Sequence, residues 1–524
     1  MDSEDKDHPP EQEHPPDPKA AGKPRTLPAA FNWMSQAGLA LIVVSVLGAV
    51  GLLVAGAVLP SPPVYIGLLL APPVLLLVVG VVLFPLGYLL ERRKRERGET
   101  GIRAPRIVID LGLAQHRMVL FALLIGGIVA ALVFVIGSFA TFQTMASNEF
   151  CGQVCHQVMQ PEYTAHQYTP HARVKCVDCH VGSGVGWYVH SKLTGLRRLA
   201  ALVTQSYVRP IPTPIQDMRP SRETCEECHW PSRFVGYKEK VHTYFIKGET
   251  NPVHKLRLLL KIGGADSPFI KGFGIHYHML GADKVEYVAR DRQRQEIAWV
   301  RVTRPDGKVT EYNNEEFPLT VQERPGHPVR RMECLDCHNR PAHEFKSPID
   351  AVDEAMAAGT ITRELPLIKV RAVKALDGKY ETTAGADKGI AEAIAKFYRE
   401  NYPDLATKQA PLLQKTIADL QAIYRSSFFP EMNVKWSAYP DNIGHRDWPG
   451  CFRCHSDKMK SAQGKTVFTD CTRCHLILAQ GKTVDRSAPV NFARGEPFDH
   501  PGNSEMIKDY TKCVDCHSGG SELY

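Results

Sequence analysis

All 14 cysteines of the chain occur in pairs, and a histidine directly follows every pair. A cysteine pair followed by histidine is the attachment motif of c-type haem: the thiols form thioethers with the porphyrin, and the histidine binds the iron. The sequence therefore predicts seven covalently bound haem c groups. We number the units in chain order as motifs 1 to 7: Cys151/Cys155/His156, Cys176/Cys179/His180, Cys225/Cys228/His229, Cys334/Cys337/His338, Cys451/Cys454/His455, Cys471/Cys474/His475 and Cys513/Cys516/His517.

Paired cysteines can also hold zinc or an iron–sulfur cluster, or form disulfides. Those sites do not require a histidine after every pair, and only 21 of the 524 residues are histidine, so chance placement is negligible. No cysteine remains outside the motifs. Covalent haem attachment takes place outside the cytoplasm, so we expect the motifs on the positive, periplasmic side of a bacterial inner membrane.

A second ligand decides what such a haem can do. With two protein ligands it transfers electrons, and with an open face it can bind and reduce a small molecule. We expect His171, His343, His445 and His500, each close to a motif, as distal ligands first, followed by His276 or His278. His166 is a further candidate. His190, His242, His254 and His327 could equally be ligands or surface histidines. No Cys-x-x-Cys-Lys unit, a marker of nitrite-reductase-like sites, occurs.

The elements that position the motifs begin with a membrane anchor. Residues 26–90 contain no Asp, Glu, Lys or Arg. The run is too long for one span and predicts two transmembrane helices at roughly 36–59 and 64–90, the second kinked by its prolines. Another charge-free run predicts a third span at about 118–142. Residues 1–30, rich in proline and charge, are expected to be a disordered tail.

Loop charge predicts the orientation of this anchor. The 91–117 loop carries eight basic residues, whereas the 60–63 turn carries none. The positive-inside rule places this loop and the N-terminus in the cytoplasm, so the third span would deliver Cys151 to the periplasm. The first span lacks a cleavage site and is predicted to be an uncleaved anchor.

Between motifs 3 and 5 the pattern changes. Residues 296–312 alternate apolar and polar side chains around Pro-Asp-Gly, which predicts a hairpin and hence a small β insertion. His276 and His278 alternate as strand residues do. Residues 349–359, 388–401 and 404–427 carry apolar side chains at helical spacing and predict a helical spacer.

A membrane helix ending in Phe-Cys, then Cys-His-x-x-Met and HARVKCVDCH, resembles the NapC/NirT-type membrane quinol dehydrogenases over roughly 118–235. The resemblance implies that the haem nearest the membrane takes electrons from a quinol. The family usually has two residues within motif 1 and a Met two after its His. Here the gap is three and Met159 is three after His156. The ligand set of the first haem therefore stays open between His156, Met159 or both in different states.

The same family places a lysine near the quinol headgroup shortly after motif 2, and Lys192 matches that position. The alternative is that Lys192, Arg197 and Arg198 extend to lipid headgroups. An acidic residue often found nearby in the family is missing, since no Asp or Glu occurs between Val181 and Gln216. The proton acceptor for quinol oxidation is therefore unassigned.

The expected fold class is a membrane-anchored multihaem cytochrome c, with three transmembrane helices plus a mainly α/irregular haem domain with a small β insertion. The expected regions are a disordered cytoplasmic tail at 1–30, a three-helix membrane anchor at 31–145, a NapC/NirT-like trihaem region at 146–235, a β-containing insertion at 236–333, haem 4 with a helical spacer at 334–440, and a C-terminal trihaem region at 441–524.

The whole layout resembles the heptahaem inner-membrane cytochromes c of metal-respiring bacteria. We expect a quinol dehydrogenase that relays electrons from the membrane quinol pool to a periplasmic c-type cytochrome or reductase in anaerobic respiration. One alternative is a terminal multihaem reductase of a small nitrogen or sulfur substrate, and another is a non-catalytic bridging subunit. The net charge of +7, of mixed sign, gives nucleic-acid binding little support.

Overall fold

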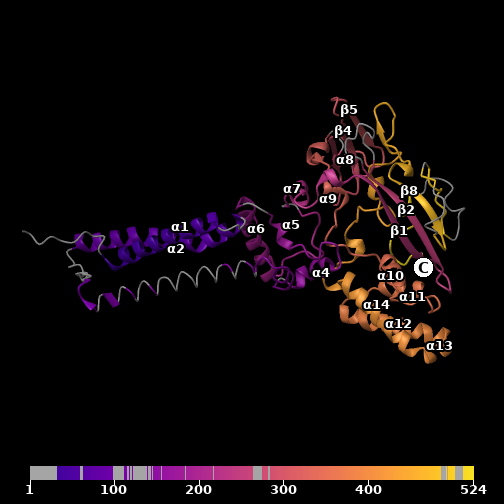
Figure 1. Ribbon diagram of the computed structural model, residues 1–524, viewed down its shortest axis with the longest axis horizontal. Coiled ribbons are helices and arrows are strands. Elements are labelled where there is room, and N and C mark those ends of the chain that lie inside the picture. Colours follow the sequence, from indigo (N-terminus) through magenta and orange to yellow (C-terminus); the bar gives the residue numbers. More distant parts are fainter. Residues whose placement is uncertain are drawn as a thin grey trace, which may run out of the picture. The chain divides into compact units, whose positions relative to one another are not determined.

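The computed structural model forms two compact units, Met1–Phe142 and Gln143–Tyr524, which are described separately (Figure 1). The structure describes residues 32–58, 63–97, 145–154, 156–182, 185–215, 218–263, 274–280, 284–320, 322–484, 494–501 and 512–523, together with isolated positions between 111 and 143 and residues 491–492.

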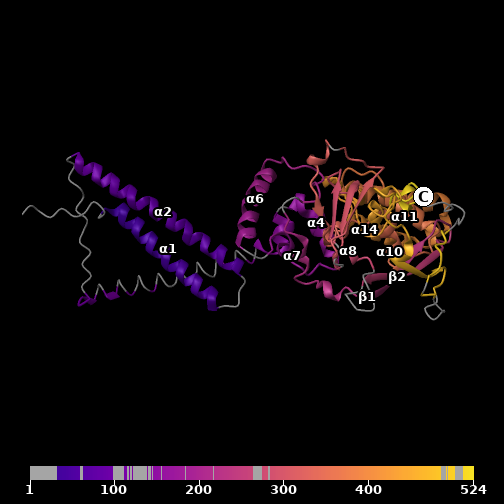
Figure 2. The same cartoon turned by 90° about the horizontal axis from the view of Figure 1, so that it is seen from above.

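The first unit contains two long apolar helices, α1 (Trp33–Val58) and α2 (Pro63–Glu96), which lie side by side in both views (Figures 1 and 2). Both are long and apolar enough to cross a membrane, over Trp33–Leu52 and Leu75–Lys94. Small residues let the backbones approach: a Cβ built on Gly80 would lie 2.7 Å from the carbonyl oxygen of Gly38. These helices coincide with the first two predicted spans.

Other parts of the predicted anchor are not described. The third predicted span, 118–142, lies outside the described residues apart from isolated helical positions, and so does the predicted tail at 1–30. Helix α2 runs through Pro72, Pro73 and Pro85 and ends with the first basic residues of the 91–117 loop.

Short helices carry the first motifs of the second unit, and the described residues of 146–235 include no strand, as expected where haems replace an apolar core. A π-helical turn (Phe150–Val154) leads into α4 (His156–Gln167), α5 (Cys176–His180), the longer α6 (Val185–Val203), α7 (Ser221–Cys225) and a 3₁₀ turn (Pro231–Arg233). Motif 4 forms the similar short helix α9 (Cys334–Cys337).

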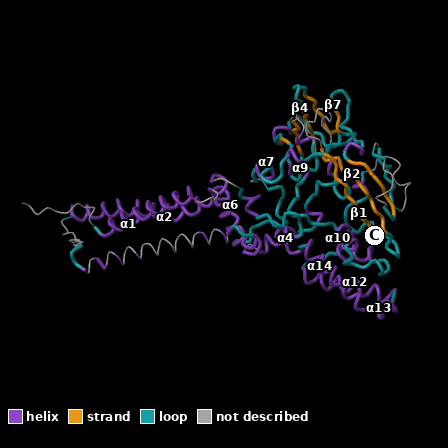
Figure 3. Tube along the Cα trace, in the orientation of Figure 1, coloured by secondary structure: helices purple, strands orange, loops and turns teal. Residues whose placement is uncertain are grey.

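Two antiparallel sheets follow, and they hold more strand than the small insertion we predicted (Figure 3). The predicted hairpin at 296–312 is present as β4 and β5. In order across each sheet, the three-stranded sheet contains β1 (Gly236–Phe245), β2 (Val253–Gly263) and β8 (His475–Gly481), and the five-stranded sheet contains β6 (Arg330–Arg331), β3 (Lys284–Ala289), β4 (Ile297–Thr303), β5 (Val309–Asn314) and β7 (Met459–Ser461).

The strand interpretation of His276 and His278 is wrong. This segment forms a helical turn, α8 (Tyr277–Leu280), and the amide of Met279 donates to the carbonyl of His276 at 2.9 Å. Residues two apart share a face on a strand, whereas on a helix they are separated by about 200°. The two imidazoles can therefore serve different partners.

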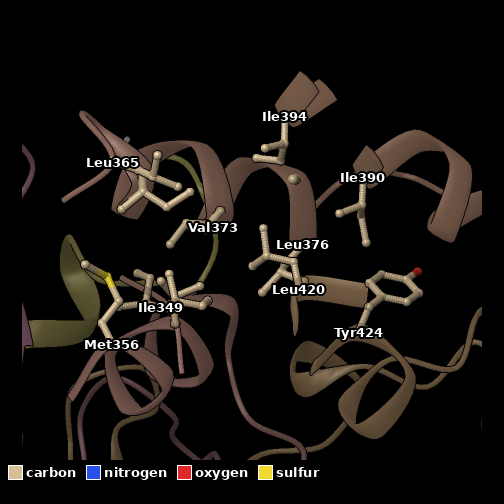
Figure 4. Close-up of a cluster of buried hydrophobic side chains, with 14 of the residues drawn as sticks. Ile349, Met356, Leu365, Val373, Leu376, Ile390, Ile394, Leu420 and Tyr424 are labelled. Atoms are coloured by element: carbon tan, nitrogen blue, oxygen red, sulfur yellow. The ribbon is translucent and has the colours of Figure 1, made fainter. Parts of the chain in front are cut away.

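The helical spacer has an apolar core of its own (Figure 4). Leu365, Val373, Ile390 and Leu420 are among its fully buried side chains. The predicted helix at 404–427 is divided at Gln409, and one further helix, α11, was not predicted. The elements are α10 (Pro348–Ala357), α11 (Ile368–Leu376), α12 (Thr383–Asn401), α13 (Pro403–Lys408) and α14 (Ala410–Ser427).

Candidate functional site

Motifs 2, 4 and 7 have the sequence Cys-x-Asp-Cys-His and share one local turn. In motif 2 the carboxylate of Asp178 accepts from the backbone amide of Lys175 at 3.1 Å, and in motif 4 Asp336 accepts from Glu333 at 2.8 Å. Asp515 makes the same bond in motif 7. This bond satisfies an amide that a helix N-terminus leaves unpaired. It fixes the turn that presents both cysteines and the histidine. Our sequence interpretation missed these aspartates, although their repeated position was visible.

The two cysteines of a motif differ in exposure, which their spacing did not predict. In motifs 3 to 7 one cysteine of each pair is half-buried and the other is exposed, and the exposed ones are Cys228, Cys337, Cys451, Cys471 and Cys516. In motif 7 the half-buried Cys513 has its Sγ 3.7 Å from Nδ1 of His445, whereas Cys516 lies at the surface. A thioether bond needs only a thiol that the porphyrin can reach, so both kinds of cysteine suit attachment. The attachment of haem to Cys516 and to the other cysteines stays a prediction.

The histidines of motifs 2 to 7 each face a second histidine from elsewhere in the chain. The ring centroids of the six pairs are 5.8 to 6.3 Å apart. The pairs are His180 with His343, His229 with His171, His338 with His276, His455 with His278, His475 with His445, and His517 with His500.

These separations suit an iron ion between two imidazoles. A metal–nitrogen bond is about 2 Å long, as for zinc, and the centroid of an imidazole ring lies roughly 1 Å beyond its ligating nitrogen. Two imidazoles on opposite sides of one metal ion should therefore have their centroids about 6 Å apart. The residues present therefore fit haem with two axial histidines at motifs 2 to 7. Each of the six distal histidines favoured from sequence takes part in one pair.

Most of the distal rings are also anchored through their other nitrogen. The Nδ1 atoms of His171, His276 and His343 lie 3.0 to 3.1 Å from the carbonyl oxygens of Pro341, Ile262 and Glu162, and His278 Nδ1 lies 3.4 Å from that of Ile275. Such a bond holds the proton on Nδ1 and leaves Nε2 free to bind a metal. Burial, together with the charge of Arg340, lowers the pKa of His343 to about 3, which keeps this ring neutral.

The other predicted ligand residues lie elsewhere. Met159 is half-buried on α4, while Cys155 and the side chain of His156 lie outside the description. His166 is buried, with its ring 6.1 Å from that of His343. His190 is exposed beside Trp187, His254 is buried on β2, and His327 Nδ1 lies 3.1 Å from the carbonyl oxygen of Ala289.

Cysteines of successive motifs lie near one another along the series. The Cys151 and Cys176 thiols share a hydrogen bond, which is the main cause of the raised pKa of Cys176. Cys334 acts in the same way on Cys225. At the other steps a cysteine of one motif interacts electrostatically with a cysteine of the next: Cys179 with Cys228, Cys337 with Cys451, Cys474 with Cys451, and Cys513 with Cys471.

Helix α6 carries Lys192, the residue suggested for a quinol site. Its exposed positions include Leu193 and Val203, at 64% and 77%, together with Arg197 and Arg198. The side chain of Lys192 itself is not described. Exposed apolar side chains among arginines are typical of a helix that lies at a membrane surface.

His242 provides a pH-dependent prediction that does not involve the paired histidines. Its ring stacks on Tyr244, and burial, with the charge of Lys240, lowers its pKa to about 4. The unfolded chain binds a proton near pH 6.5, whereas the folded chain does so only near pH 4. Stability should therefore fall by about 1–2 kcal/mol as the pH drops between these values, after allowance for solvent screening.

Denaturant unfolding of the wild type and of His242→Phe at pH 7.5 and pH 4.5 measures this effect. Phenylalanine keeps the stacked ring and removes the titrating group, so the variant should lose less stability on acidification. Equal losses in the two proteins would refute the prediction.

Comparisons with known proteins identify the family of the chain. Residues 114–210 match the model of the NapC/NirT cytochrome c family, N-terminal region. The chain is 38% identical over 462 residues to the cytochrome c-type protein ImcH of Geobacter sulfurreducens, which covers 87% of this chain and 89% of that protein. No solved structure matches the chain.

The match over most of both chains shows the family, and the family carries covalently bound haem c and transfers electrons at a membrane. The two apolar helices fit such an anchor. The chain therefore belongs to the NapC/NirT cytochrome c family, as a membrane-associated electron-transfer cytochrome.

Proposed function

We propose that this chain is an inner-membrane quinol dehydrogenase that takes electrons from quinol near motif 1 and relays them through seven c-type haems to a periplasmic acceptor. Haem supplies one-electron redox chemistry, and the protein supplies spacing, ligands and electrostatics. The observation that carries the proposal is the set of six histidine pairs at one common separation. Family membership supports electron transfer at a membrane.

The histidine pairs favour a relay over a terminal reductase. A reductase needs an iron with one open face, and the six distal histidines would close that face at motifs 2 to 7. Motif 1 is the exception, since Met159 lies on the helix that begins at His156 and the ligand set there stays open. The hydrogen bonds between cysteines of motifs 1 and 2 and of motifs 3 and 4, with electrostatic interactions between cysteines at the other steps, support one continuous series in chain order.

Electron entry is proposed at α6, on the periplasmic side of the membrane. Quinol oxidation releases two protons and two electrons, so the site must hold the quinol hydroxyl groups and accept protons. Lys192 would bind a hydroxyl oxygen of the quinol headgroup, with the exposed Leu193 and Val203 against the lipid. The basic loop from Arg92 onward would lie in the cytoplasm. The acceptor would be a soluble c-type cytochrome or a reductase.

Replacing Lys192 tests the entry site. In liposomes, Lys192→Leu should slow haem reduction by a menaquinol analogue by about tenfold or more, the usual scale for loss of a charged hydrogen bond. Reduction by dithionite, which needs no quinol site, should be unchanged. Arg197→Leu, on the exposed side of the same helix, is the matched control and should keep wild-type rates. Equal quinol-driven rates in all three proteins would remove Lys192 from the site.

A further inference from the structure

Motifs 4 and 5 are separated by more than a hundred residues in sequence but meet at a buried aspartate. Asp336 lies between the two cysteines of motif 4, and its side chain is 4% exposed. Its Oδ1 accepts from the hydroxyl of Tyr287 at 2.5 Å and pairs with the guanidinium of Arg294 at 2.8 Å. Its Oδ2 accepts from the amide of Glu333. The three partners of the carboxylate therefore all come from residues 287–333, which precede motif 5 in the chain.

The carbonyl of the same residue is held from motif 5. Arg453 lies between Cys451 and Cys454, and its Nη2 donates to the Asp336 carbonyl oxygen at 2.6 Å. Its Nη1 donates to the carbonyl of Arg294 at 2.8 Å, and its Nε to that of Gly450 at 2.9 Å. All three guanidinium nitrogens therefore bind backbone oxygens in a fixed fork.

This arrangement joins strand β3 and the loop after it to both motifs. Tyr287 comes from β3 and Arg294 from the following loop. Asn442, ahead of motif 5, donates to the Asp336 carbonyl at 3.0 Å. Hydrogen bonds within one buried network polarise and strengthen one another, because water is excluded from them.

We propose that Arg453 and Asp336 form a clamp that holds motifs 4 and 5 at a fixed separation, so that electrons cross from motifs 1 to 4 to the C-terminal motifs 5 to 7. The proposal rests on the electron relay described above. Each crossing moves one electron, which oxidises the group held by motif 4 and reduces the group held by motif 5. Arg453 and Asp336 are positioning residues and exchange no electrons or protons themselves.

The chain offers a matched control within motif 6. Arg473 occupies the same place between its cysteines as Arg453 does in motif 5, but its guanidinium lies over the ring of Phe468, 5.4 Å from the centroid. Arg453→Gln and Arg473→Gln therefore make the same change at equivalent positions. Only the first breaks the bonds to Asp336 and Arg294.

Hydrogen exchange of the mature full-length protein tests the clamp without relying on quinol activity. In Arg453→Gln, amides of residues 334–338 as well as 450–455 should exchange about tenfold faster or more, because a buried network loses its bridging donors. Arg453→Lys, which keeps a positively charged donor group but not the planar fork, should restore part of the protection. Arg473→Gln should leave motif 4 unchanged. Unaltered exchange at motif 4 in Arg453→Gln, or an equal increase in Arg473→Gln, would overturn the clamp.

Rapid reduction by a menaquinol analogue gives the functional readout. In Arg453→Gln the haems of motifs 5 to 7 should be reduced in a second phase about tenfold or more slower, since displacing a group from its required geometry costs rate steeply. If quinol reduces no haem even in the wild type, the proposed function fails while the exchange result still decides the clamp. If Arg453→Gln does not mature, Tyr287→Phe replaces it: this variant keeps the ring, removes only the hydroxyl that donates to Asp336, and should loosen residues 450–455.

Discussion

Replacing His343 with alanine is expected to open one axial position at the haem of motif 2. The reduced variant should bind one carbon monoxide more per chain than the wild type and show a new high-spin signal. His343 lies 6.1 Å from His180 between ring centroids, and its Nδ1 contacts the carbonyl oxygen of Glu162 at 3.0 Å. Arg340 and Glu162 lie beside the His343 ring, and among the described residues His166, 6.1 Å from it between ring centroids, is the group placed to replace it.

The effect on electron flow should be large, because motif 2 precedes five further motifs in the series. Reduction beyond motif 2 should slow by about tenfold or more when its ligand set changes. His327→Ala is the control, since His327 contacts the Ala289 carbonyl and faces no motif histidine among the described residues. If His343→Ala stays low-spin, the double variant His343→Ala/His166→Ala shows whether His166 has replaced His343 as the iron ligand. A low-spin double variant that binds no carbon monoxide would exclude His343 as a ligand.

Replacing Lys369 with methionine is expected to destabilise the helical region by about 3–5 kcal/mol, the usual cost of leaving one member of a buried ion pair uncompensated. Lys369 is fully buried, and its Nζ lies 2.7 Å from Asp353 Oδ1 and 2.8 Å from the carbonyl oxygen of Ile349. Asp353 Oδ1 also accepts from the Phe245 amide at 2.9 Å. The pair thus ties α10 and α11 to the end of β1.

Denaturant unfolding followed by circular dichroism measures this effect. Lys415→Met removes one member of the exposed Lys415–Asp419 pair and should cost no more than about 0.5 kcal/mol. Lys369→Met combined with Asp353→Leu should recover only part of the loss, because the Phe245 amide is then left without its acceptor. A cost for Lys369→Met as small as that for Lys415→Met would show that the buried pair does not support the fold.

The chemistry could be predicted from the sequence to a large extent. Attachment motifs are local, so cysteine spacing and the next residue define them without a fold. Each of the six distal histidines favoured from the sequence faces a motif histidine, although its role as an iron ligand stays a prediction. The hairpin at 296–312 followed from a turn, Pro-Asp-Gly, that sets its own backbone.

The partners of those histidines could not be predicted, because they depend on long-range contacts. His171 precedes motif 2 by only five residues, yet its ring faces His229 of motif 3. His343 follows motif 4, yet it faces His180 of motif 2. A histidine close in sequence sits on the same stiff segment as its neighbouring motif and cannot easily reach across that haem.

One error and one omission have simple physical causes. His276 and His278 alternate as strand residues do, but they lie on a helical turn. The ring of His276 therefore faces His338 of motif 4, and the ring of His278 faces His455 of motif 5. Strand β8, which begins at His475 of motif 6, was not predicted, because periodicity alone does not distinguish its short apolar run from a buried helix. The contacts of Asp336 and Arg453 join residues whose roles appear only when the two motifs meet.

Reductive titration of the mature full-length protein in liposomes with a menaquinol analogue tests the quinol-driven relay itself. We expect the quinol to reduce all seven haems of each chain, and we expect carbon monoxide to bind the reduced protein at no haem other than that of motif 1. Haems that dithionite reduces fully but quinol leaves oxidised, or strong carbon monoxide binding at motifs 2 to 7, would contradict this function.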